Sequence, residues 1–216
     1  MIGRLTRAWT GIDIAFNQSG GRVHLPGAVG QWATTLASGM MDAGELTYLA
    51  AALSAYPWDG RSVVVEIGAY VGSTSAFMAK VLQQLGHRVP ILSIDPFERA
   101  VPGPIDPQGI YGAYLKTIRE HGVEDVCLPL VAFSKDAAPV VPDTIGVLVV
   151  DGGHEYPVVR GDLHDYGPKV RPGGFIFIDD YSDPFPGVRR AVDEYFVETR
   201  PFTIVHKSYF VVAQRQ

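Results

Sequence analysis

From residue 62 onward, short and almost wholly apolar runs alternate with segments of helical periodicity. This alternation constrains the fold more than any other feature of the chain. The apolar runs span residues 62–67, 91–94, 126–131, 145–150 and 175–178, and the helical segments span about 75–85, 110–120, 156–166 and 188–197. Strands that lack polar alternation are buried on both faces, so the pattern predicts a parallel sheet with helices on both sides.

Two further apolar runs end the chain, residues 202–205 and 209–212, with only three residues between them. A parallel crossover needs a dozen or more residues, so these two strands must be antiparallel. The predicted fold class is α/β: a doubly wound, Rossmann-like, seven-stranded, mostly parallel sheet with an antiparallel C-terminal hairpin. Such a hairpin on such a sheet resembles the class I S-adenosylmethionine (SAM) methyltransferases.

The first 60 residues do not share this alternation. Repeated glycines make residues 1–30 irregular, whereas residues 31–55 are predicted to be helical in two pieces around residues 39–44. A Pro-Trp-Asp-Gly turn at residues 57–60 closes the region. We expect one domain overall, with residues 1–60 as a helical cap or acceptor region and residues 61–216 as a SAM-binding core.

Composition excludes several classes of protein. Lys+Arg 18 against Asp+Glu 23 gives a net charge of −5, which argues against a protein that coats nucleic acid. The single cysteine, Cys127, cannot form an internal disulfide, so a reducing compartment is expected. No apolar run approaches the roughly 18 residues of a membrane helix. We therefore expect a cytoplasmic protein without nucleic-acid or membrane partners.

A glycine-containing turn follows the first strand, in the segment EIGAYVGS at residues 66–73. This E-x-G-x-x-x-G pattern differs from the G-x-G-x-x-G of pyrophosphate-binding turns, and an acidic side chain there suits an ammonium or a sulfonium better than a phosphate. Asp95, at the end of the second strand, is placed to accept hydrogen bonds from both hydroxyls of a ribose, with Phe97 against an adenine.

A simpler interpretation of this region remains open. Glycines also permit a tight turn, and Glu66 and Asp95 would then be ordinary strand-end acids. The two acids together with the hairpin favour a nucleoside ligand without phosphates, for which SAM is the obvious candidate.

Carboxylates follow two later strands, Asp151 after residues 145–150 and Asp179-Asp180 after residues 175–178. If these strands are neighbours, about 4.8 Å apart, the three carboxylates converge. They would repel one another unless a cation lay between them, and oxygen ligands favour Mg²⁺, or else Mn²⁺ or Ca²⁺. Alternatively, the Asp pair is a solvated corner, Asp151 caps a helix, and His154 is an ordinary loop histidine.

Residues from about 62 to 212 resemble the metal-dependent small-molecule O-methyltransferases of the macrocin and aminocoumarin sugar type. The most specific part is DGGHEYPVVRGDLHDYGPKVRPGGFIFIDDY, residues 151–181. The resemblance implies that Asp151, Asp179 and Asp180 bind the metal, that the metal holds the acceptor hydroxyls, and that His154 or Asp151 takes the proton. The compact chain is also similar to the methyltransferases of mycobacterial methylmannose polysaccharide synthesis.

The predicted function is therefore SAM-dependent and divalent-metal-dependent O-methylation of a hydroxyl of a sugar or glycoside, by a homodimer. The predicted cofactor site comprises Glu66, Gly68, Tyr70, Gly72, Ser73, Asp95, Phe97, Ser134 and Asp151. The alternatives are a catechol or other phenolic O-methyltransferase and a non-catalytic SAM-binding regulator. An NAD-dependent dehydrogenase is disfavoured because the phosphate-cradling glycines are missing.

Overall fold

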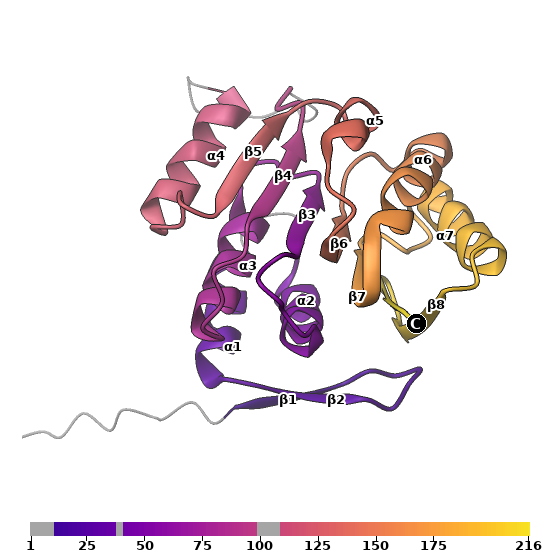
Figure 1. The fold of residues 1–216 in the computed structure, drawn as a ribbon, viewed down its shortest axis with the longest axis horizontal. Coiled ribbons are helices and arrows are strands. Elements are labelled where there is room, and N and C mark those ends of the chain that lie inside the picture. The colour runs from indigo at the N-terminus through magenta and orange to yellow at the C-terminus, as the bar shows by residue number, and fades with distance from the viewer. Residues whose placement is uncertain (1–10, 38–40, 99–108) are drawn as a thin grey trace, which may run out of the picture.

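A seven-stranded sheet forms the centre of the molecule in the computed structural model, which describes residues 11–37, 41–98 and 109–216 (Figure 1). Its strands are β3 (Val63–Ile67), β4 (Ile91–Asp95), β5 (Cys127–Val131), β6 (Ile145–Val150), β7 (Val170–Ile178), β8 (Phe202–Lys207) and β9 (Val211–Arg215). Their order is β5-β4-β3-β6-β7-β9-β8. The first five pair in parallel, and β9 lies antiparallel between β7 and β8. The predicted fold class is confirmed.

Helices cover both faces of the sheet because successive residues of each buried strand point to opposite sides. The longer helices are α1 (Gly27–Leu36), α2 (Ala43–Ala55), α3 (Ser73–Gln84), α4 (Gly109–Glu120), α6 (Tyr156–Tyr166) and α7 (Pro186–Glu198). Short turns add α5 (Ser134–Ala137), η1 (Ala138–Val140) and η2 (Gly167–Lys169). In β6, Val147 and Val149 pack under α1 to α4, whereas Leu148 and Val150 belong to the core under α5 to α7.

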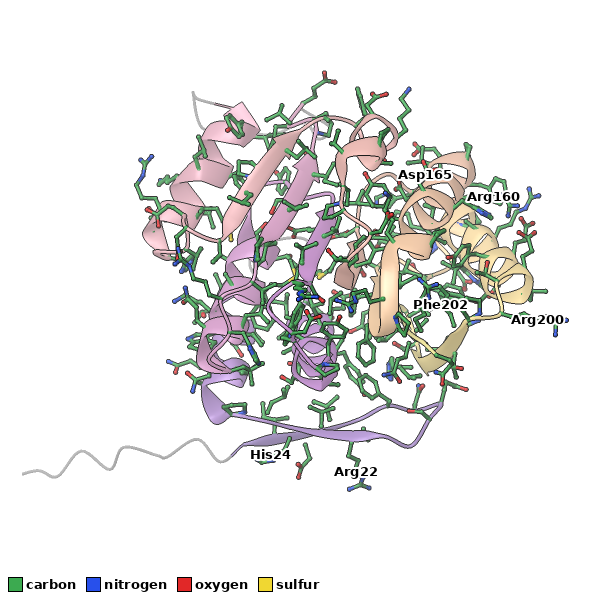
Figure 2. The ribbon with its side chains drawn as sticks, viewed as in Figure 1. Arg22, His24, Arg160, Asp165, Arg200 and Phe202 are labelled. Carbon is green, nitrogen blue, oxygen red and sulfur yellow. The ribbon has the colours of Figure 1, made fainter. Side chains whose placement is uncertain are left out.

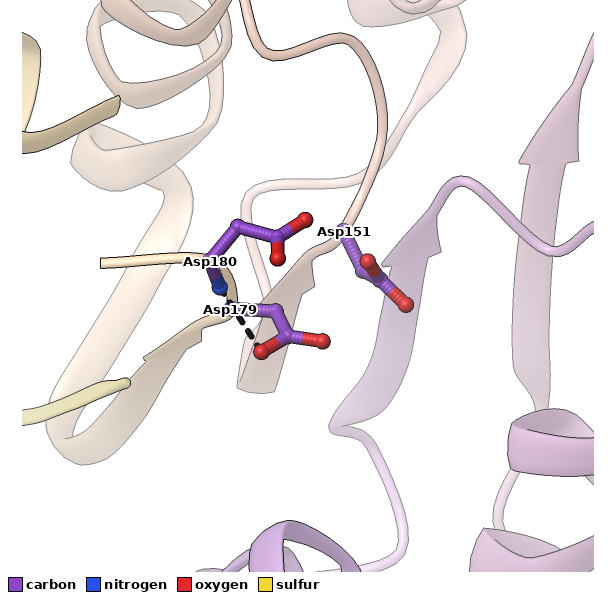
Figure 3. Close-up of side chains that lie close together, drawn as sticks. All are labelled: Asp151, Asp179 and Asp180. Atoms are coloured by element: carbon purple, nitrogen blue, oxygen red, sulfur yellow. Dashed lines mark hydrogen bonds between the residues drawn. The ribbon is translucent and has the colours of Figure 1, made fainter. Parts of the chain in front are cut away.

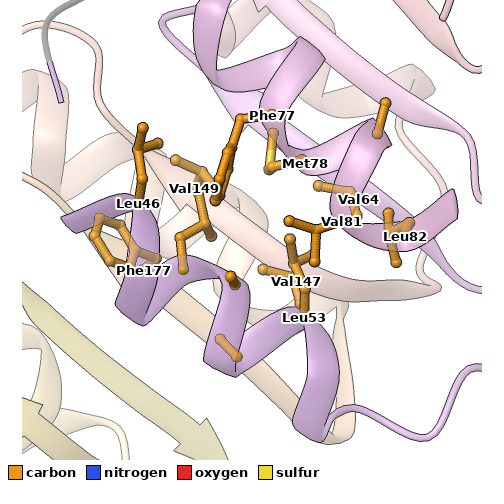
Figure 4. Close-up of a cluster of buried hydrophobic side chains, with 14 of the residues drawn as sticks. Leu46, Leu53, Val64, Phe77, Met78, Val81, Leu82, Val147, Val149 and Phe177 are labelled. Carbon is orange, nitrogen blue, oxygen red and sulfur yellow. The ribbon is translucent and has the colours of Figure 1, made fainter. Parts of the chain in front are cut away.

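The first of these two cores brings the N-terminal helices onto the sheet. Figure 4 shows Leu46 of α2 near Phe77 of α3 and Val149 of β6, and Leu53, farther along α2, near Val147. Each of these side chains is almost completely buried. Arg200 lies at the periphery in Figure 2 and is exposed, as many of the charged side chains are. Within residues 11–37, 41–98 and 109–216, no helix combines the length and apolarity needed to cross a membrane.

The N-terminal segment differs from the prediction. The two helical pieces are confirmed as α1 and α2. The expectation that residues 1–30 are irregular is wrong for residues 11–30, and residues 1–10 lie outside the described residues. Strands β1 (Ile12–Ala15) and β2 (Arg22–Leu25) pair antiparallel and run along one end of the molecule (Figure 1). Gly20, with φ +69°, and Gly21 lie in the turn that connects the two strands, where both are hydrogen-bonded to Phe16 through the backbone.

The C-terminal hairpin is confirmed as antiparallel, but its turn lies later than predicted. β8 continues through His206 and Lys207, and the turn follows at residues 208–210. His206 is only 5% exposed and lies against the rings of Tyr48 and Phe210, with centroids 4.0 and 4.9 Å away. The histidine therefore behaves as an aromatic core residue of a strand, not as a polar turn residue.

β7 is also longer than the predicted residues 175–178, because it begins at Val170. Its first part contains Pro172, Gly173 and Gly174, residue types that are uncommon inside a strand. The pairing with β6 is irregular there, shifting between the Ile145–Val170 and Val147–Phe175 pairs. A register shift of this kind accommodates extra residues within a strand.

Candidate active site

The register of β6 and β7 brings the three predicted carboxylates together. Val150 pairs with Ile178, so Asp151 and Asp179 leave neighbouring strands side by side, and the Asp179 amide donates to the Val150 carbonyl at 3.1 Å. One oxygen each from Asp151, Asp179 and Asp180 lie within 4.8 Å of one another (Figure 3). The expectation that these strands are neighbours is confirmed, and the solvated-corner interpretation does not fit this convergence.

The electrostatics of this cluster are unfavourable without a positive charge. Burial raises the pKa of Asp151 well above its usual value, and the charges of Asp179 and Asp180 raise it further. Among the described residues, no lysine or arginine forms an ion pair with any of the three carboxylates. Crowded oxygen donors with no cationic side chain between them fit a hard divalent cation, so the donor set agrees with the metal implied by the resemblance.

His154 lies beside this cluster. Its Nε2 is 2.8 Å from Oδ2 of Asp180, and its ring packs against Phe185 with centroids 4.3 Å apart. Asp180 has a positive φ of 58°, and its amide donates to Oδ1 of Asp179 at 2.7 Å. A small pocket at the ends of β6 and β7 is lined by the three carboxylates and His154, together with apolar residues of α6 and α7. The structure thus brings together the predicted metal ligands and the predicted base.

A fourth carboxyl group, which the sequence analysis did not identify, reaches the cluster from α2. Glu45 is only 5% exposed, and its carboxyl group lies close to that of Asp179. Burial and the closeness of the two acids together raise the pKa of Asp179 above its usual value. The sequence signal at Glu45 was a D-x-x-E capping pattern starting at Asp42, which indicates the start of a helix and nothing about its distance from β7.

The glycine turn after β3 packs directly against the end of β6. Gly68 has φ +91°, and a Cβ there would lie 1.9 Å from the carbonyl oxygen of Asp151. Gly72 has φ +83°, and its Cβ would lie 2.8 Å from Tyr114. At both positions a side chain would clash with neighbouring atoms, so close packing requires glycine, in agreement with the tight-turn interpretation. Their close packing also places the turn next to the carboxylate cluster.

Asp95 joins this turn to the one after β4. Its two carboxylate oxygens accept the backbone amides of Tyr70 at 2.9 Å and Phe97 at 2.6 Å. Tyr70 and Phe97 both have positive φ, and the Phe97 ring lies against Tyr111 and Tyr114. The structure thus brings together three of the predicted cofactor residues at the carboxyl ends of β3 and β4.

The other predicted cofactor residues differ in their location and exposure. Ser73 begins α3, directly after Gly72, and Ser134 begins α5, three residues beyond the end of β5. Glu66 is 1% exposed and is hydrogen-bonded by Ser75, which in turn lies 2.9 Å from the hydroxyl of Ser93. Burial raises the pKa of Glu66 to about 7. In this structure Glu66 belongs to a buried hydroxyl network and is not exposed beside Asp95.

Comparison with known proteins identifies a family and several similar proteins. A family model described as a methyltransferase domain matches residues 65–181, more than half of the chain. The O-methyltransferase NovP has a similar structure, with a TM-score of 0.67, 21% identity and 82% of both chains covered. TomG from Streptomyces achromogenes, an O-methyltransferase involved in tomaymycin synthesis and solved in complex with SAM, has a TM-score of 0.59, 19% identity and covers 88% of this chain and 89% of its own.

A curated relative is also found. The uncharacterized protein R132 of Acanthamoeba polyphaga mimivirus is 27% identical over 126 residues. The match covers 55% of this chain and 51% of R132, so the chain spans about half the length of that relative. The two solved structures are similar in fold, at identities near one fifth.

Proposed function

The chain belongs to the methyltransferase-domain family, and from that premise we propose a divalent-cation-dependent O-methyltransferase that acts on a hydroxyl of a sugar or glycoside. Membership bears out the predicted enzyme class and implies SAM as the methyl donor. The observation that carries the rest of the proposal is the convergence of Asp151, Asp179 and Asp180 beside the glycine turn. Burying three carboxylates together is energetically unfavourable, and a methyltransferase whose acceptor needs no activation would not require such a cluster.

The proposed cofactor site lies along the carboxyl ends of β3, β4 and β5. Each oxygen of Asp95 accepts one backbone amide and retains a second lone pair for a ribose hydroxyl. Phe97 offers an aromatic face for the adenine. The remaining proposed contacts come from Gly68, Tyr70, Gly72, Ser73, Ser134 and Asp151. Bound SAM supplies the electrophilic methyl group on its sulfonium.

In the proposed metal centre, Asp151, Asp179 and Asp180 hold Mg²⁺, or else Mn²⁺ or Ca²⁺. A cation held there supplies Lewis acidity that lowers the pKa of a hydroxyl ligand. His154 is the proposed base, since it lines the same pocket as the three carboxylates and an imidazole nitrogen can accept a proton. Asp151 is the rival base, but a carboxylate that is a metal ligand is a weaker proton acceptor. His154 lies on the loop that leaves β6, three residues beyond Asp151, within reach of the same pocket.

The acceptor is proposed to bind between this centre and the N-terminal region. Glu45 on α2 lies at the cluster, which supports an acceptor role for the region of residues 1–60, within the part of it that the structure describes. The sugar assignment rests on the resemblance of residues 151–181. The net charge of −5 favours a small acceptor over a nucleic acid. We further propose that the protein is a cytoplasmic homodimer. Sedimentation-velocity centrifugation would measure its mass in solution.

A panel of glycosides and catechols incubated with SAM tests this proposal, with methyl transfer followed by mass spectrometry. We expect methylated glycosides, loss of activity with excess EDTA, and recovery with added Mg²⁺. Asp179→Asn should lose activity, whereas Asp183→Asn, at a side chain that is 90% exposed, should retain it as the matched control.

Three results would contradict parts of the proposal. Full activity in EDTA, or in Asp179→Asn, would remove the metal from the mechanism. Turnover of catechols alone would favour the phenolic alternative. SAM binding with no turnover of any hydroxylated acceptor would favour a regulator.

A further inference from the structure

The loop after β7 holds Asp180 in a backbone conformation that residues with a side chain seldom adopt. Its φ of 58° lies in the left-handed region, which persists at such residues where the surrounding contacts determine it. The Asp180 amide is bonded to Oδ1 of Asp179 (Figure 3), and its carbonyl accepts the Ser182 amide at 2.7 Å. Both partners belong to the same loop, so neither fixes that loop to the rest of the protein. The next residue, Tyr181, makes contacts beyond it.

Tyr181 connects this loop to two other elements. The residue is only 9% exposed and packs in the core under α5 to α7. Its hydroxyl donates to Oδ1 of Asp193 on α7 at 2.9 Å, and Nζ of Lys207 donates to the same oxygen at 2.9 Å. The Lys207 ammonium, at the end of β8, also lies 4.4 Å from the centroid of the Tyr181 ring, within the range of a cation–π interaction. These three residues thus contact one another in a closed set, which we call the Tyr181 clasp.

The backbone of Lys207 is held in turn by the N-terminal hairpin. The side-chain amide of Asn17, in the turn between β1 and β2, accepts the Lys207 N–H at 3.0 Å and donates to the Lys207 carbonyl at 2.8 Å. Asn17, Asp193 and Lys207 all lie outside residues 65–181, the stretch that matches the methyltransferase family. Segments on both sides of the family match therefore hold the residue that follows a proposed metal ligand.

We infer that Tyr181 is a positioning residue of the proposed cation centre, held by the other two residues of the clasp. With the Tyr181 ring and hydroxyl anchored, the Asp180 backbone keeps its left-handed conformation. One carboxylate oxygen of Asp180 then stays within 4.8 Å of oxygens of Asp151 and Asp179. A loop without this anchor would relax toward commoner conformations, and cation affinity would fall with the fraction of molecules that keep the binding one. The inference rests on the proposed metal dependence.

Charge alone predicts a different effect for Lys207. An ammonium repels a divalent cation, so removing the ammonium should strengthen cation binding or leave it unchanged. The clasp instead predicts weaker binding, and the sign of the change distinguishes the two. Arg189 supplies a matched control, because its guanidinium lies 5.7 Å from the same ring centroid but pairs with the exposed Asp183, outside the clasp.

The test measures Mn²⁺ affinity, with free Mn²⁺ followed by electron paramagnetic resonance, in wild-type protein and four variants. SAM affinity by calorimetry should be unchanged in all of them, and thermal denaturation measures folding. We expect Mn²⁺ affinity to fall at least about fivefold in Lys207→Met and in Tyr181→Leu, the equivalent of the cost of about 1 kcal/mol for one left-handed residue. Lys207→Arg, which keeps the cation, and Arg189→Met should stay within about twofold of wild type.

The outcomes separate this inference from the proposed function. If wild-type protein binds Mn²⁺ and Lys207→Met binds it equally well or more tightly, the clasp does not position Asp180 and the inference is wrong. Equal losses in Lys207→Met and Arg189→Met would also contradict it, because the effect would not depend on the clasp. Lys207→Met decides the question if Tyr181→Leu does not fold, since the Lys207 side chain is 34% exposed. Wild-type protein that binds no Mn²⁺ would overturn the proposed metal centre, and this inference with it.

Discussion

The burial of Glu66 predicts a specific dependence of stability on pH. The carboxyl is 1% exposed, and burial raises its pKa from 4.5 to about 7 despite the hydrogen bonds from Ser75 and Ser93. The folded protein therefore holds this proton more tightly than the unfolded chain does. Below about pH 4.5 both states are protonated and the group has no effect. Between about pH 4.5 and 7 only the unfolded state loses the proton, so the free energy of unfolding falls as pH rises.

The magnitude follows from the size of the pKa change. One pKa unit is worth about 1.4 kcal/mol, so a rise from 4.5 to about 7 amounts to about 3 kcal/mol. Above about pH 7 Glu66 is ionised in both states, and the full destabilisation is present. Glu66→Gln keeps the size of the side chain and its hydrogen-bonding oxygen but cannot ionise. The variant should therefore lose the part of the pH dependence that belongs to Glu66.

Urea denaturation of wild-type protein and Glu66→Gln, in EDTA and at steps between about pH 4.5 and 7.5, measures this difference. The carboxylate cluster titrates in both proteins, so its contribution cancels when the two are subtracted. We expect the unfolding free energy of Glu66→Gln relative to wild type to rise by about 3 kcal/mol across this range. Parallel curves for the two proteins would refute the reasoning, because they would mean that Glu66 is equally acidic in both states.

Two further predictions concern the proposed cofactor site and the proposed base. Asp95→Ala removes an acceptor of charge-assisted hydrogen bonds worth about 1.5–3 kcal/mol each, so SAM affinity measured by calorimetry should fall at least about tenfold, and unchanged affinity would exclude Asp95 as a ribose ligand. His154→Ala should lower kcat by about 10²–10⁴ with SAM affinity retained, while loss of the 2.8 Å contact to Asp180 should also weaken Mn²⁺ binding. Near-wild-type turnover would instead mean that Asp151 or solvent accepts the proton.

The sheet could be predicted because its strands are buried on both faces. Val147 and Val149 face one core and Leu148 and Val150 face the other, so every position in β6 must be apolar and the strand is evident in the sequence. The β1–β2 hairpin is half exposed, and its short strands carry only a weak alternation around two glycines. Such glycines are compatible with a hairpin turn or with an irregular loop, and only the contacts of β1 and β2 with the rest of the protein distinguish the two.

The carboxylate cluster could be predicted for a similar reason. Asp151, Asp179 and Asp180 directly follow strands, and parallel neighbours end at the same edge of the sheet. Glu45 could not be predicted, because its proximity to Asp179 depends on how α2 packs across the first core. No local pattern encodes that packing. The buried position of Glu66 was missed since an acid at a strand end can face either a ligand or the space under its own turn.

The proposed metal ligands and their surroundings therefore come from different parts of the chain. Asp151, Asp179 and Asp180 lie inside the family match, on strand ends whose positions follow from the sheet itself. Glu45 and Lys207 lie outside it, on α2 and at the end of β8. A change in either outer segment would alter the charge and order around Asp179 and Asp180 while leaving the strand-end acids in place.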